Sequence, residues 1–133
     1  MKIADVEGIG PSYAAKLQKA GVRTTDDLLK RGAKRSGREQ LEKASGISHA
    51  KILEWVNHVD LYRIDGIGSE YSDLLEAAGV DSPAELAQRV ATTLATKMAE
   101  VNARKKLVRH VPGEATVAAW IAQAKRLPKV VEH

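Results

Sequence analysis

The 133-residue chain contains no cysteine and no phenylalanine, and aromatic residues make up only 4% of it. Because cysteine is absent, disulfide bonds, thiolate zinc sites and cysteine nucleophiles are excluded. Because aromatic residues are few, aliphatic side chains must supply most of the buried area. No apolar run is long enough to span a membrane, and the first residues lack the apolar region of a signal peptide. These absences predict a soluble, cytoplasmic protein with an aliphatic core.

The charge balance is mildly basic. Lys and Arg number 21 against 17 Asp and Glu, which gives a formal net charge of +4. This balance permits binding to a polyanion without requiring it. One run without any acidic residue contains Lys30, Arg31, Lys34, Arg35 and Arg38. The run is either a solvated linker or a set of supplementary phosphate contacts.

A Gly-Ile-Gly stretch at residues 8–10 precedes Pro11, which suits the first position of a helix that runs to about Ala20. Glycine reaches positive φ without a steric clash, so the stretch is typical of a tight bend between two helices. The first amides of the following helix lack intrahelical acceptors and attract anions. The bend is therefore a candidate phosphate site, although a turn that only joins two packed helices would need the same glycines.

A second, weaker bend is expected at residues 46–48, where Ser48 replaces the second glycine and can cap the next helix. Capping-box spacings predict further helix starts at Thr24, Ser36 and Ser82, each with an acidic residue three positions later. No segment alternates apolar and polar residues as a strand does. We therefore expect an all-α fold.

The pattern restarts near residue 61. Nine positions are identical between residues 3–29 and 61–87: Gly8/Gly66, Ile9/Ile67, Gly10/Gly68, Tyr13/Tyr71, Leu17/Leu75, Ala20/Ala78, Gly21/Gly79, Val22/Val80 and Leu28/Leu86. A fourth bend, at residues 110–114, is degenerate. This internal repeat predicts a first unit at residues 1–60, a second unit at residues 61–127 and a frayed tail at residues 128–133.

Residues 6–14 resemble the helix-hairpin-helix motif, whose pattern is an apolar residue, a spacer, Gly-apolar-Gly, three variable residues and Ala. Residues 64–72 fit the same pattern except that Ser72 stands in the Ala position. The resemblance implies two consecutive double helix-hairpin-helix units with a SAM-like fold. Over almost the whole chain, the arrangement most resembles an uncharacterised bacterial family of such proteins, which is known only as a domain of unknown function.

Helix-hairpin-helix domains generally bind DNA without sequence preference, through hairpin amides and nearby basic or hydroxyl side chains. Pro11 has no N–H and removes one donor from the first hairpin. Transferred to this sequence, the resemblance and the basic run together predict DNA contacts at Gly8, Ile9, Gly10, Ser12, Lys16, Gly46, Ile47, Ser48, Lys51, Lys34, Arg35 and Arg38.

The third bend, formed by Gly66, Ile67 and Gly68, is expected to be structural because Glu70 stands at its mouth and repels phosphate. The alternative function is therefore a protein-interaction or scaffold module that keeps the fold without binding DNA, with a protein partner bound through residues 61–127. The sequence shows no nucleophile with a base, and its four histidines lack metal-ligand spacing. We expect no enzymatic activity, metal, cofactor, small-molecule substrate or membrane partner.

Overall fold

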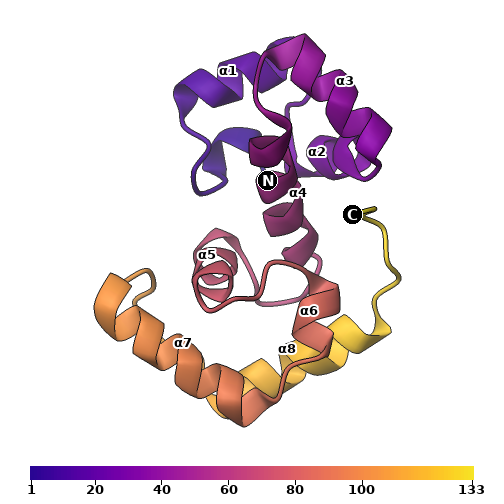
Figure 1. Ribbon diagram of the computed structural model, residues 1–133. Coiled ribbons are helices and arrows are strands. Elements are labelled where there is room, and N and C mark those ends of the chain that lie inside the picture. The colour runs from indigo at the N-terminus through magenta and orange to yellow at the C-terminus, as the bar shows by residue number, and fades with distance from the viewer. The chain divides into compact units, whose positions relative to one another are not determined.

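The computed structural model describes residues 1–133 and consists of eight α-helices and one short 3-10 helix (Figure 1). The only β feature is an isolated bridge between Lys2 and Thr24. The all-α prediction is confirmed. The chain divides into two compact bodies: the first unit comprises Met1–Asp60 together with Lys129–His133, and the second unit comprises Leu61–Pro128.

The first unit begins with η1, and α3 packs against both α1 and α2. Its elements are η1 (Ile3–Asp5), α1 (Pro11–Lys19), α2 (Thr25–Gly32), α3 (Arg35–Ser45) and α4 (His49–Leu61), the last of which ends one residue beyond this unit. The predicted aliphatic character of the interior is confirmed, because Leu17, Leu28 and Leu41 have no exposed surface.

The local signals place most helix ends in the first unit. Pro11 opens α1, and Thr24 caps α2 in a complete capping box with Asp27, whose carboxylate accepts the Thr24 N–H at 3.2 Å. The predicted start at Ser36 is wrong: α3 begins at Arg35, with Lys34 as its N-cap. Only two residues separate α2 from α3, and Lys34 is the one with an extended backbone, so the helix starts directly after it.

The second unit has α8 packed against α6 and α7, while α5 packs against α7. Its helices are α5 (Ser69–Ala77), α6 (Pro83–Ala87), α7 (Ala91–Lys105) and α8 (Glu114–Arg126). The Ser82 hydroxyl caps α6 by accepting the Glu85 N–H at 3.2 Å. The core is again mostly aliphatic and includes the indole of Trp120.

Residues 129–133, which we call the strap, differ from the expected frayed tail. The Val131 side chain is only 1% exposed. The Glu132 N–H donates to the Ala33 carbonyl at 2.7 Å, and the Arg38 guanidinium donates to the Glu132 carbonyl at 2.7 Å. The strap is thus held to the first unit by a buried side chain and by main-chain hydrogen bonds.

Candidate nucleic-acid interface

The first bend has the backbone that its glycines predict. Gly8 adopts a φ of +86°, which strains any residue with a Cβ. The Ile9 N–H donates to the Val6 carbonyl at 3.0 Å, and the Ile9 side chain is only 3% exposed. The predicted surface role of Ile9 is therefore limited to its backbone, because its side chain anchors the bend in the core.

Gly10 has no structural requirement for glycine. Its φ and ψ of −83° and −179° are open to other residues, and a Cβ built there would meet nothing within 4 Å. Gly10 is the N-cap of α1, yet no side chain caps this helix. Pro11 offers no N–H, so the open amides at this end belong to the exposed Ser12 and to Tyr13. The start of α1 therefore has open space beside Gly10 and, next to it, amide groups without a helical acceptor.

Two lysines from different helices meet over one aromatic ring. The Nζ atoms of Lys16, on α1, and Lys51, on α4, lie 5.8 and 5.5 Å from the centroid of the Tyr13 ring. Tyr13 is itself fixed by an edge-on contact with Trp55, with ring centroids 5.1 Å apart. Such cation–π contacts hold an ammonium group near the ring while leaving its other side to solvent. The fold thus brings together Lys16 and Lys51, two of the residues at which DNA contacts are predicted.

A shallow groove of about 530 Å³ runs beside these lysines, and we call it the lysine groove. It includes the second bend, so this bend shares one surface with residues of α1 and α4. Its lining residues are Tyr13, Lys16, Gly46, Ile47, Ser48, Ala50, Lys51 and Glu54. Glu54 is an acidic member that the sequence analysis did not identify.

The second bend offers fewer donors than its sequence predicts. Gly46 ends α3 with a φ of +75°, and the Ile47 side chain is buried. Four amides around the bend already have acceptors within the protein: Gly46 N to Glu42 O (2.8 Å), Ile47 N to Ser45 Oγ (3.1 Å), His49 N to Glu42 Oε2 (3.0 Å) and Lys51 N to Ser48 Oγ (3.3 Å). These four amides are therefore not available to a phosphate, whereas the Lys51 ammonium and the Ser48 hydroxyl hydrogen could contact one.

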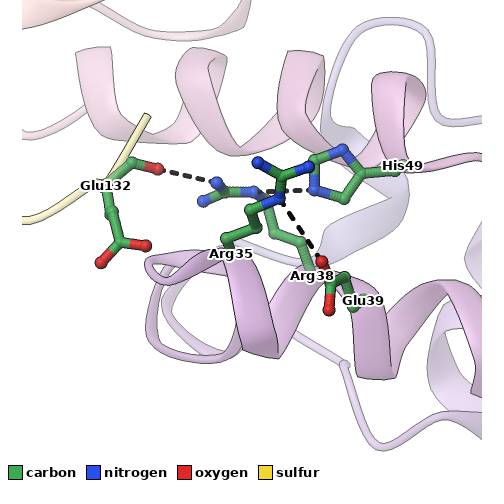
Figure 2. Close-up of polar contacts among 5 residues, drawn as sticks. All are labelled: Arg35, Arg38, Glu39, His49 and Glu132. Carbon is green, nitrogen blue, oxygen red and sulfur yellow. Dashed lines mark hydrogen bonds and ion pairs between the residues drawn. The ribbon is translucent and has the colours of Figure 1, made fainter.

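The basic run is divided between surface and interior. Lys34 and Arg35 are exposed, and Arg35 forms an ion pair with Glu39 at 3.4 Å (Figure 2). Arg38 is only 1% exposed, and its guanidinium donates to the Gly32 carbonyl at 2.8 Å. Burial lowers the pKa of the Arg38 guanidinium from its usual value, because desolvation penalises the charged form. The structure therefore removes Arg38 from the predicted DNA-contacting surface.

The third bend has a similar shape and a different surface. Gly66 adopts a φ of +93°, Ile67 is buried, and the Tyr71 and Trp120 ring centroids are 5.2 Å apart. Buried Leu74 stands at the position that corresponds to Lys16, and exposed Glu70 lies in the first turn of α5. This bend accordingly presents no lysine beside its tyrosine.

The comparisons with known proteins bear on the family. None of the helices combines the length and the apolar composition that a membrane span requires. A family model described as "Domain of unknown function (DUF4332)" matches residues 7–127, a span that runs through both units. The chain therefore belongs to the DUF4332 family, which confirms the expected relation to an uncharacterised family. Neither a curated protein nor a solved structure was found to match it.

Proposed function

We propose that this protein is a non-enzymatic module that binds the DNA backbone through the lysine groove, and that its bends are helix-hairpin-helix elements. The observation that carries the proposal is the convergence of Lys16 and Lys51 over Tyr13, beside the uncapped start of α1. Two cations and open amides on one surface complement a row of phosphates. The space at Gly10 would admit a phosphate close to the backbone.

Corresponding contacts in the two units support the proposed repeat. Arg31 donates to the Ala20 carbonyl at 2.8 Å at the end of α1, and Arg89 donates to the Gly79 carbonyl at 2.9 Å after α5. In the first unit this contact joins α2 to the end of α1. In the second unit it joins the residues after α6 to those after α5. If the second unit is a duplicate of the first, its acidic third bend has kept the packing of the first bend and lacks the lysines.

The burial of the aromatic residues favours backbone contact over base readout. Trp55 and Trp120 are each only 2% exposed, and Tyr13 already packs against Trp55. No tryptophan is therefore available as a stacking platform for unpaired bases. Binding should depend on phosphates, so its affinity should fall steeply as salt is added.

The first test is fluorescence anisotropy of labelled duplex and single-stranded DNA over a salt series. We expect Lys16→Gln and Lys51→Gln each to weaken binding and to reduce the slope of log affinity against log salt by about 0.7–0.9, which corresponds to one lost phosphate contact. Lys125→Gln removes the same charge from the exposed surface of α8 and should change binding little. The proposal is wrong if the wild type binds no DNA at low salt, or if all three variants lose affinity equally.

A second test separates binding from folding at adjacent glycines. Gly10→Ala should leave the melting temperature almost unchanged, because its φ of −83° suits alanine and the added Cβ has space. The same change should weaken DNA binding several-fold if a phosphate lies against this residue. Equal affinity for Gly10→Ala and wild type would exclude close phosphate approach at the first bend.

A second candidate function, protein interaction through residues 61–127, is favoured by one feature of the second unit. Val90 is 64% exposed and lies at a hollow of about 350 Å³ that also includes Leu94, Arg89 and Lys97. An apolar hollow with basic neighbours suits a partner segment that carries both apolar and acidic side chains. A Val90→Asp variant that loses a co-purifying partner and retains DNA binding would separate the two functions.

A further inference from the structure

The strap occupies the first unit in the way that a peptide occupies a receptor. Both main-chain polar groups of Glu132 are paired, the N–H with the Ala33 carbonyl and the carbonyl with Arg38, each at 2.7 Å. The two valines that precede it alternate in exposure, since Val131 is 1% exposed and Val130 is 41% exposed. Paired main-chain groups and one inserted side chain are the contacts by which proteins bind extended peptides.

A further contact fixes the end of the strap. The His133 Nε2 lies 2.8 Å from the Asn57 Oδ1, and Asn57 is only 7% exposed. A buried amide that meets the strap gives the site a polar contact one residue beyond the paired main chain of Glu132.

Arg38 is oriented by the body of the first unit. Its Nη1 donates to the carbonyls of Gly32 and Ala33 at 2.8 and 3.2 Å, which leaves Nη2 directed at Glu132. Figure 2 shows that the main-chain carbonyl of Glu132, and not its carboxylate, points to this guanidinium. Arg38 therefore binds position 132 through the main-chain carbonyl, while the Glu132 carboxylate acts on the guanidinium only through its charge.

We propose that the first unit contains a binding site for an extended peptide segment, formed by Ala33, Arg38 and Asn57, and that the strap is its resident ligand. The ligand class is an extended segment with a branched apolar residue at the Val131 position, followed by a residue that pairs through its main chain. An empty site would leave a buried guanidinium without one of its acceptors, which favours occupancy. The proposal does not depend on nucleic-acid binding.

The site is connected to the start of α4 through Arg38. The Arg38 Nε donates to the His49 Nε2 at 3.3 Å (Figure 2). His49 is the first residue of α4. Release of the strap should therefore change the environment of the His49 ring, which provides a reporter that lies outside the strap itself.

The test compares adjacent valines in the full chain by NMR. In wild type, the Glu132 amide should be protected from hydrogen exchange. Val131→Asp should abolish this protection and shift the His49 ring signals, because a carboxylate cannot occupy a buried apolar position. Val130→Asp makes the same change at an exposed position and should preserve both the protection and the ring signals.

A peptide with the sequence of residues 128–133 is then added to each protein. We expect it to shift the Ala33, Arg38 and His49 signals of Val131→Asp at millimolar concentration, a range in keeping with a segment that is normally held by its own chain. It should leave wild type unchanged, because the strap already fills the site. Failure of the peptide to bind a folded Val131→Asp protein, or equal shifts in all three proteins, would overturn the proposal.

Circular dichroism establishes whether the Val131→Asp protein retains its helices. If that protein does not fold, amide exchange in wild type decides the question. The Glu132 amide should then exchange more slowly than that of Val130 and faster than the core amides of α3, as expected for a segment that detaches alone. Exchange of the Glu132 amide at the rate of an unfolded peptide would show that no occupied site exists.

Discussion

The first and second units place a tyrosine and a buried tryptophan behind a glycine of positive φ, with ring centroids 5.1 and 5.2 Å apart. Their outer surfaces differ. Two lysines lie over Tyr13, whereas the Tyr71 hydroxyl donates to the His110 carbonyl at 2.9 Å. The bend and its aromatic pair therefore serve packing in both units. Only the cations distinguish a surface that could bind phosphate.

The largest expected effect comes from removing each indole. Trp55→Ala and Trp120→Ala should each reduce the free energy of unfolding by about 3–5 kcal/mol, because a buried indole is lost and a cavity remains. Each variant retains one tryptophan, which reports on the other unit. Denaturant unfolding followed by fluorescence and circular dichroism shows whether the two units unfold together. Coincident transitions in both variants would mean that the units form a single cooperative system.

Glycine replacement gives a smaller effect and a sharper comparison. Gly8→Ala should cost about 1–2 kcal/mol, because alanine is strained at a φ of +86°. Gly66→Ala should cost more, because its Cβ would lie 3.1 Å from the Trp120 Nε1, against 3.7 Å from the Trp55 Nε1 at Gly8. Thermal unfolding of the two variants checks this order, and the reverse order would contradict the geometry.

The smallest predicted effect concerns the helix caps. The pKa of Asp27 is lowered, first by the hydrogen bond from the Arg23 N–H and then by that from the Thr24 N–H. Because the folded pKa lies below the ordinary value of 3.8, the carboxylate stabilises the fold above that pH. This stabilisation is lost as the pH falls through the folded pKa.

Thermal unfolding of wild type and Asp27→Asn at about pH 6 and about pH 3 measures this loss. The difference between the two proteins should shrink at the lower pH. Ser82→Ala, which removes the corresponding cap in the second unit, should cost about 1 kcal/mol at both pH values, because a serine does not titrate. A constant difference between wild type and Asp27→Asn would show that the Asp27 charge contributes nothing.

Local signals predicted most of the helices, and long-range contacts limited the prediction of the site. Pro11, Thr24 and Gly46 act at helix ends through their own backbone and side-chain chemistry, which a single sequence reveals. Arg38 was assigned to the surface because it follows four other basic residues. Its acceptor on the strap lies 94 positions away, and no local pattern signals such a pairing.

The acidic neighbours of the second bend were missed for a related reason. Glu42 caps the His49 amide from seven residues upstream, across the turn between α3 and α4. Capping rules look for a partner within the first helical turn, so they identified Ser48 and overlooked this carboxylate. The positive character of the site therefore depends more on Lys16 and Lys51 than the sequence indicated.

The division of the chain has a mechanical consequence. The second unit is inserted between Asp60 and Lys129, so residues 1 and 133 both belong to the first unit. A tension applied between those two residues would load the strap before it reached the inserted body. The hydrogen bonds of Glu132 thus close a loop of the chain that contains the whole second unit. As long as these hydrogen bonds remain intact, the tension is not transmitted to the inserted second unit.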